Sequence, residues 1–399
     1  MPADAAGERA ARPALIGASA ARTAWRRGRV PPLAPLGVRV GSALGAPLRV
    51  AMLAPPWISV PPPGYGGVEE VVSALTEALV RRGHAVTLFC APGSRSSATV
   101  VTLLDLPHPD EIERSLYEVD HVARAFEEIE RAHRRFDVIH DHCGFTAVAM
   151  ADRIETPIVH TLHGQFTPST SAFYSHHAGK VTLVGISRAQ LACAPPGLGP
   201  IPAIPNPLDA SAWPLQERKG DYLLWIGRMT PEKGPHRAIA AAHAADVRLV
   251  LAGVIQPGQQ AFFDREIAPH IDGDRVQFVG EVAGATKRTL FAHARGLLMP
   301  IRWDEPFGMV MVEALACGTP VIAFAEGAAR ELVLEGRTGF LVADEQAMAA
   351  AVGRLPGIAP RDCRAWVTAN CDVDVVAGAY EHAYRAALAL RSVAGVARV

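Results

Sequence analysis

At 399 residues the chain exceeds the roughly 250 to 300 residues over which one hydrophobic core usually extends, so we expect two domains. Hydrophobic residues make up 49% of the sequence and charged residues 20%, a globular composition that excludes a largely disordered chain. The formal net charge of -1 excludes a general electrostatic attraction to nucleic acid or anionic membranes. An anionic ligand therefore needs a local site.

Six cysteines are spread singly along the chain, without a CxxC pair or a spacing typical of zinc sites or disulfide frameworks. We expect reduced thiols in the core of a cytoplasmic protein. No apolar run approaches the roughly 20 residues of a membrane-spanning helix, and membrane contact is not indicated. Residues 1–47 are rich in Ala, Pro, Gly and Arg and are predicted to be a disordered leader; a targeting segment and an extension from a misplaced start codon are the alternatives.

From residue 48 short β-type runs alternate with helical stretches, the pattern of parallel sheets covered by helices on both faces. The first series predicts a Rossmann-like domain over residues 48–210. Amphipathic segments at 68–82 and 110–135 link its strands. The runs are apolar along most of their length, as strands buried on both faces should be. They lie at 48–53, 85–90, 137–140, 157–162 and 181–187.

A Pro- and Gly-rich stretch at 195–214 can sustain neither a helix nor a central strand, and we place the interdomain linker there. A second Rossmann-like domain is predicted over residues 211–375. Residues 376–399 form a C-terminal helix and tail that we expect to cross back to the first domain. The strands of the second series are expected at 221–229, 247–254, 276–282, 296–302, 320–324 and 339–342.

The segment from Trp303 to Ile322 carries the densest functional signal. A strand ends near Arg302, a turn follows, and a helix begins near Gly308, so the free amides of the first helical turn face the end of the strand. Such a helix start suits a diphosphate. Glu305 in the turn and Glu313 on the helix can accept hydrogen bonds from sugar or ribose hydroxyls. A lone pair of glutamates is more often structural, but the accompanying glycines and proline favour the functional interpretation.

The run EPFGMVMVE, from Glu305 to Glu313, resembles the signature of retaining glycosyltransferase family 4, which has the GT-B fold of two facing Rossmann-like domains. The resemblance covers about residues 48–390. It implies that the first glutamate contacts the donor sugar and the second the nucleotide ribose. It also implies that the amides of the turn approach sugar and phosphate. The corresponding donor-binding residues here are Glu305, Gly308, Met309, Val310 and Glu313.

A strand end followed by a turn, WIGRMTPEKG, brings two cations together. The planar fork of Arg228 and the point charge of Lys233 form a suitable clamp for a diphosphate leaving group. In isolation a solvated basic turn would be the simpler interpretation. The resemblance implies that Arg228 and Lys233 neutralise the donor diphosphate and belong to the catalytic set.

The glycines of PPPGYGGVEE allow the backbone to approach a ligand closely, although a plain turn before a helix is the alternative. The GxGxxG fingerprint is absent, so no dinucleotide cofactor is indicated. The resemblance implies that Gly66 and Gly67 reach the donor diphosphate across the cleft, and that the first domain forms the acceptor pocket. It also implies that His163, after a cleft-facing strand end, contacts the donor sugar near the reaction centre.

Zinc binding by His140 and His142 is a weak alternative, because no third ligand at suitable spacing accompanies them. Structural histidines are favoured. Ser187, Arg188, Asn206 and the run 326–331 also match landmarks of the family. The nucleobase is expected near the turn after residues 279–282, where backbone contacts leave little trace in the sequence.

Together these features predict a metal-independent, retaining hexosyltransferase without a cofactor. Its donor is a nucleoside diphosphate sugar, with a UDP-sugar favoured and GDP-mannose second. The sequence does not distinguish between a small molecule, a lipid-linked sugar and a glycan as the acceptor. Nucleic acid is not expected as a partner. An epimerase or phosphorylase of the same fold and a non-catalytic nucleotide-sugar-binding protein are the alternatives.

Overall fold

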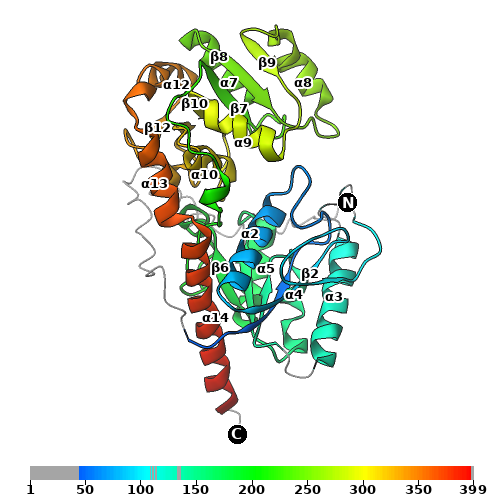
Figure 1. The fold of residues 1–399 in the computed structure, drawn as a ribbon. Coiled ribbons are helices and arrows are strands. Elements are labelled where there is room, and N and C mark those ends of the chain that lie inside the picture. The colour runs from blue at the N-terminus through cyan, green and yellow to red at the C-terminus, as the bar shows by residue number, and fades with distance from the viewer. Residues whose placement is uncertain (1–44, 108, 110–111, 113–114, 133–135, 397–399) are drawn as a thin grey trace, which may run out of the picture.

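The protein, seen in a computed structural model, is described here over residues 45–396 apart from 108, 110–111, 113–114 and 133–135. Residues 1–44 of the predicted leader lie outside the described range. The described chain forms two α/β domains stacked end to end, one above the other in Figure 1. Each contains a six-stranded sheet in which every strand pair is parallel.

The first sheet has the strand order β3-β2-β1-β4-β5-β6. Five of its strands fall on predicted runs, and the edge strand β3 is an addition. Its order reverses between β1 and β4, and in such sheets ligands bind at that point, beyond the carboxyl ends of the strands. The strands are β1 (Arg49–Leu53), β2 (Ala85–Cys90), β3 (Thr99–Thr102), β4 (Val138–Asp141), β5 (Ile158–Leu162) and β6 (Thr182–Gly185).

The second sheet has the order β12-β11-β10-β7-β8-β9, with its reversal between β7 and β10. Every one of its strands begins within a predicted run, but several end earlier, because the residues that follow belong to loops that line the cleft between the domains. The strands are β7 (Tyr222–Ile226), β8 (Arg248–Ala252), β9 (Val276–Phe278), β10 (Gly296–Met299), β11 (Val321–Phe324) and β12 (Gly339–Val342).

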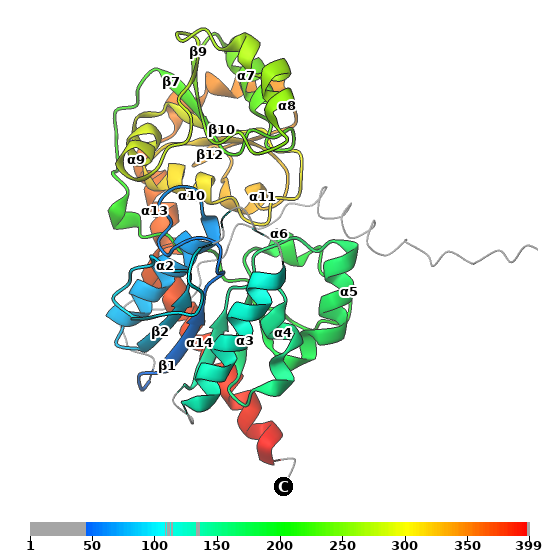
Figure 2. The same ribbon diagram turned by 90° about the vertical axis from the view of Figure 1, so that its right-hand side faces the viewer.

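Helices cover the faces of the sheets, as Figures 1 and 2 show from two sides. In α2 the apolar residues recur at helical spacing, and Val71, Val72, Leu75 and Leu79 are buried on one face. The α-helices are α2 (Gly67–Arg81), α3 (Ser115–Arg131), α4 (Thr146–Ala149), α5 (Pro168–His177), α6 (Arg188–Leu191), α7 (Pro235–Ala245), α8 (Gln260–Glu266), α9 (Gly284–His293), α10 (Met309–Ala316), α11 (Ala329–Leu332), α12 (Glu345–Val352), α13 (Pro360–Asn370) and α14 (Val373–Val396).

The long helix α14 leaves the second domain and packs along the first, in agreement with the expected crossover. Its apolar face joins the same core cluster as β1, β2 and α2. Glu381 accepts a hydrogen bond from Arg82 Nε at 2.5 Å and lies 2.9 Å from His84 Nε2. The hydroxyl of Tyr384 lies 2.7 Å from His140 Nδ1, and both side chains are fully buried. The helix therefore belongs to the core of the first domain.

Candidate active site

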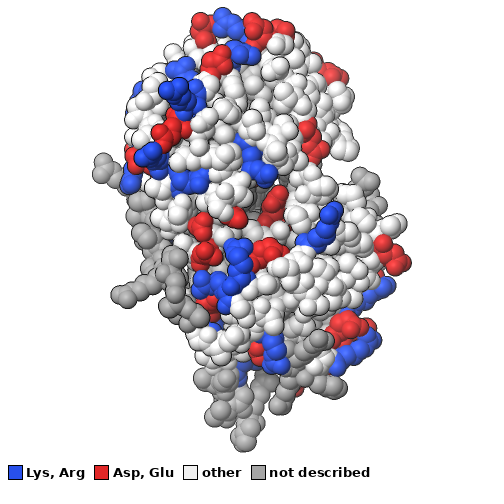
Figure 3. All heavy atoms as spheres, viewed as in Figure 1, with Lys and Arg blue, Asp and Glu red and all other residues white. Residues whose placement is uncertain are grey.

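The loops that follow the carboxyl ends of both sheets meet at a cleft of about 1050 Å³ between the domains. The surface is hollowed there, with acidic and basic side chains at the edges of the hollow (Figure 3). All of the site residues predicted from the sequence line this cleft, namely Gly66, Gly67, His163, Arg228, Lys233, Glu305, Gly308, Met309, Val310 and Glu313.

The turn after β7 places both predicted cations in the cleft. Trp225 Nε1 donates to the carbonyl of Lys233 at 3.2 Å and so holds the turn against its own strand. Lys233 Nζ donates to Glu305 Oε2 at 2.6 Å and lies 4.7 Å from the centre of the Trp303 ring. Arg228 Nη1 lies 3.5 Å from Gln256 Oε1, whereas its buried Nε has no partner within the described part of the chain.

The turn after β10 and the start of α10 supply the opposite side of the donor half. Gly308 precedes α10 with φ of 91°, a conformation that disfavours any residue with a Cβ. The amides of Met309 and Val310 open the helix, and first-turn amides have no partner within their own helix. Glu305 Oε2 also accepts from Trp303 Nε1 at 2.9 Å. The turn thus combines a fixed carboxylate with amides suited to an anion.

Glu313 sits one turn further along α10 and is only 4% exposed. Its Oε1 accepts from Lys287 Nζ at 2.6 Å. Its Oε2 is buried and has no partner among the described residues. A buried carboxylate oxygen without a donor is costly, and a ligand hydroxyl would satisfy it. Lys287, on α9, was not predicted; in the sequence it is one basic residue on a short helix and carries no signal.

The glycine loop of the first domain reaches across the cleft. The amide of Tyr65 donates to Glu281 Oε1 of the second domain at 2.9 Å. A Cβ on Gly64 would lie 2.7 Å from the same oxygen, whereas Gly67 has open space around it. The loop therefore contacts the far domain through its backbone, and Gly67 leaves the first turn of α2 accessible from the cleft.

His163 follows β5 and stacks on His142, which follows β4. The ring centres lie 5.1 Å apart, and His142 Nδ1 lies 2.9 Å from His163 Nε2. Burial lowers the pKa of His163 to about 3 and the pKa of His142 well below its usual value, with neighbouring imidazoles acting in the same direction. Both rings are therefore neutral near pH 7, and one nitrogen of the close pair donates its proton to the other.

His140 has a structural role, in agreement with the interpretation favoured from the sequence. Its Nε2 lies 2.9 Å from Thr161 Oγ1, and its other nitrogen contacts Tyr384. His160 Nδ1 lies 2.6 Å from Asp141 Oδ2. Within the described ranges no three His, Cys, Asp or Glu side chains are grouped so that they could share a metal ion.

The remaining family landmarks connect the two domains beside the cleft. Ser187 Oγ donates to the carbonyl of Pro306 at 2.6 Å. The carboxylate of Glu331 accepts from the amides of Arg188 at 3.1 Å and Ala189 at 2.6 Å, so a residue of the second domain caps α6 of the first. Burial raises the pKa of Glu331. These contacts fix the relative position of the domains where the cleft closes.

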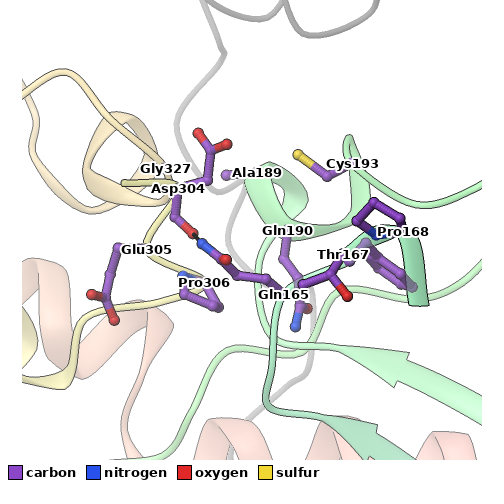
Figure 4. A pocket seen from close by; sticks show the side chains of 11 residues that line it. Gln165, Thr167, Pro168, Ala189, Gln190, Cys193, Asp304, Glu305, Pro306 and Gly327 are labelled. Atoms are coloured by element: carbon purple, nitrogen blue, oxygen red, sulfur yellow. Dashed lines mark hydrogen bonds between the residues drawn. The ribbon is translucent and has the colours of Figure 1, made fainter. Parts of the chain in front are cut away.

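A smaller pocket of about 220 Å³ lies against these contacts and shares five lining residues with the cleft, namely Gln165, Phe166, Thr167, Glu305 and Pro306. In Figure 4 the side chain of Gln165 extends from the first domain toward the backbone of Asp304. Its Nε2 donates to the carbonyl of Asp304 at 2.5 Å. The turn that carries Glu305 is therefore anchored to the first domain as well as to its own sheet.

Comparison with known proteins gives two family matches that together span both domains. Residues 65–193 match "Glycosyltransferase Family 4", and residues 211–355 match "Glycosyl transferases group 1". A glycogen synthase of Mycobacterium tuberculosis is 32% identical over 291 residues, which cover 63% of this chain and 69% of that protein.

Two solved structures show the same two-domain arrangement. AviGT4, a glycosyltransferase involved in avilamycin A biosynthesis, is 29% identical with a TM-score of 0.67, covering 86% of this chain and 98% of that one. HepE of Anabaena, solved in complex with UDP-glucose, is 19% identical with a TM-score of 0.64, covering 85% of this chain and 100% of that one. Across the described residues, no helix of the protein is long and apolar enough to cross a membrane.

Proposed function

The chain belongs to the glycosyltransferases of the GT-B fold, and we propose that it transfers a hexosyl group from a nucleoside diphosphate sugar to an acceptor hydroxyl with retention of anomeric configuration. One observation carries this proposal. Two cations, the amides of a helix start and two carboxylates, all expected from the sequence to bind the donor, line one cleft between the domains.

In the proposed reaction, the diphosphate leaves with a growing negative charge. Arg228 and Lys233 approach that charge from the turn after β7, and the amides of Met309 and Val310 approach it from the start of α10. Donors that are already oriented before the reaction stabilise such charge by several kcal/mol, about 3 to 4 for a single well-placed hydrogen bond. This stabilisation promotes departure of the leaving group.

The carboxylates orient the rest of the donor in this proposal. Glu305 accepts from hydroxyls of the sugar, and the unpartnered Oε2 of Glu313 accepts from a ribose hydroxyl. His163 lies on the opposite wall, and because its ring is neutral it can donate to or accept from the sugar without opposing a cationic reaction centre. Attack and departure on the same sugar face would give retention, and the leaving phosphate oxygen would take the acceptor proton.

The two cations of the donor half make a divalent metal unnecessary in this proposal. Transfer should therefore continue in excess EDTA. Loss of transfer in EDTA that manganese restores would contradict this part of the proposal. The anomeric configuration of the product, read from its proton coupling constants, tests retention separately.

For the donor, we favour a UDP-sugar and place GDP-mannose second. HepE, which shares the fold, binds UDP-glucose. The free state of all six cysteines supports a cytoplasmic location, where nucleotide sugars are made.

The first experiment is a thermal-shift screen against UDP, GDP, ADP and TDP and their common sugars. A ligand bound only by the native protein stabilises it by RT ln(1 + [L]/Kd). We expect stabilisation by one nucleotide family, and Arg228→Ala should abolish it. Arg248→Ala is the matched control. Arg248 is exposed at the amino end of β8, whereas the cleft lies at the carboxyl ends of the strands. A shift with none of the nucleotides, or one that survives Arg228→Ala, would contradict the proposed donor site.

A further inference from the structure

The two halves of the cleft differ in charge. The second domain contributes Arg228, Lys233 and Lys287 to the lining. The first domain contributes Glu70 and Glu118, and none of its described Lys or Arg residues lines the cleft. His142 and His163 add no positive charge near pH 7, because burial lowers both pKa values. His160 also lines this half, and its Nδ1 lies 2.6 Å from Asp141 Oδ2. The described side chains of the first-domain half therefore include two carboxylates and no lysine or arginine.

The cations of the other half are already engaged. Lys233 and Lys287 each lie 2.6 Å from a carboxylate oxygen, on Glu305 and Glu313 respectively. In the proposed function these groups and Arg228 serve the donor diphosphate and its sugars. A second anion in the cleft would have to compete with the donor for them.

Glu118 fixes one wall of the first-domain half. Its Oε1 accepts from the amides of Phe145 at 2.9 Å and Thr146 at 3.0 Å, and from Thr146 Oγ1 at 2.7 Å. The backbone that carries the Phe145 ring is thereby held at the start of α4. The ring itself is 43% exposed and packs edge-on against Phe173, with centroids 5.0 Å apart. The Phe145 ring therefore lines the cleft with part of its apolar surface exposed.

A second exposed aromatic lines the same half. Tyr65, in the glycine loop, is 55% exposed. We call Tyr65 and Phe145 the aromatic rim. Flat apolar surfaces of this kind bind the apolar face of a ring, and they lose little conformational entropy on binding.

We propose that this half of the cleft selects an uncharged acceptor that carries its hydroxyl on or beside a flat apolar ring, as in an aryl glycoside, and rejects phosphorylated acceptors. The inference rests on the proposed transfer reaction and specifies its acceptor. A phosphate brought beside Glu118 would lose water without gaining a cation from the described lining of the first domain, and the Glu118 carboxylate would repel it. An aryl ring would instead pack against an aromatic side chain of the rim.

The test compares matched acceptors by calorimetry, with and without the nucleotide that stabilises the protein. The pairs are 4-nitrophenyl β-D-glucopyranoside against its 6-phosphate, and D-glucose against D-glucose 6-phosphate. We expect the aryl glucoside to bind at least about tenfold more tightly than either phosphate. Equal or tighter binding of a phosphate, or no binding of the aryl glucoside, would overturn the inference. Absence of any nucleotide binding would instead count against the proposed function.

Two variants connect the preference to these residues. Phe145→Ala should weaken binding of the aryl glucoside by about fivefold or more and leave D-glucose and nucleotide binding unchanged. Leu116→Ala is the control, because Leu116 is 70% exposed but does not line the cleft. Ser115→Arg places a cation on the lining and should bring the phosphate within about threefold of its uncharged partner. An unchanged preference in both Phe145→Ala and Ser115→Arg would overturn the assignment.

Discussion

Replacing Glu313 by glutamine should remove the ability of the protein to distinguish a ribonucleotide from its dideoxy analogue. The carboxylate is almost fully buried, with Oε1 bound to Lys287 and Oε2 unpartnered. In the proposed complex Oε2 accepts from a ribose hydroxyl. Glutamine keeps the shape of the side chain but loses its charge.

The size of the effect follows from that burial. A hydrogen bond to a charged group contributes about 1.5 to 3 kcal/mol, which corresponds to about 10- to 150-fold in Kd. Because Glu313 is only 4% exposed, solvent screening reduces this little. The wild-type protein should therefore bind the ribonucleoside diphosphate at least about tenfold more tightly than the 2′,3′-dideoxy form. Glu313→Gln should bind the two within about threefold.

Isothermal titration with both nucleotides measures this ratio directly. Glu266→Gln, a change at an exposed carboxylate on α8, should keep the wild-type ratio. Glu313→Gln with an undiminished ratio would refute the ribose contact, as would a wild-type protein that binds both nucleotides equally. A uniform loss of affinity for both would show that the residue only supports the local structure.

Two further predictions concern stability. Burial raises the pKa of Glu69 from 4.5 to about 7, so ionisation of this carboxyl disfavours the folded state. The free energy of unfolding should therefore fall by on the order of 3 kcal/mol as the pH rises through this interval. The difference between wild type and Glu69→Gln in urea unfolding should change by about that amount between pH 5 and pH 8; a constant difference would contradict it. Tyr384→Phe leaves His140 without its 2.7 Å partner and should cost about 1 to 3 kcal/mol in urea unfolding at pH 7. His382→Ala, an exposed change on the same helix, should cost little, and equal losses in the two variants would refute the role of the buried bond.

Most of the fold could be predicted because parallel strands buried on both faces are apolar along their length. The edge strand β3 was not predicted, since two of its four residues are exposed, the other two are only partly buried, and a polar stretch precedes them. The predicted end of the strand at 221–229 was too late, because β7 stops at Ile226 and the next residues form the cation turn. The period of α14 predicts a helix, but only the structure shows the tyrosine hydroxyls that bond to buried polar groups of the first sheet.

In the cleft, too, features determined by the local sequence could be predicted, whereas contacts between distant segments could not. That Glu305 and Glu313 lie together in the cleft could be predicted, because they lie on one turn and helix, whose geometry the sequence determines locally. Lys287 and His142 could not be predicted, since each is held in the cleft by a partner distant in the sequence, Glu313 and His163 respectively. His142 was noted only as a weak zinc candidate, whereas the structure pairs it with His163 at 2.9 Å.

The paired side chains also explain how the cleft can hold so much charge at close quarters. Lys233 with Glu305, and Lys287 with Glu313, form two cation–carboxylate pairs of 2.6 Å whose side chains are at most 24% exposed. A charge left unpaired at such a depth would be strongly destabilising, so each pair holds its members in place. Because each pair holds its two side chains in one conformation, binding of a donor loses less conformational entropy. A ligand then needs only to supply donors and acceptors for the positions left open, above all Glu313 Oε2 and Arg228 Nε.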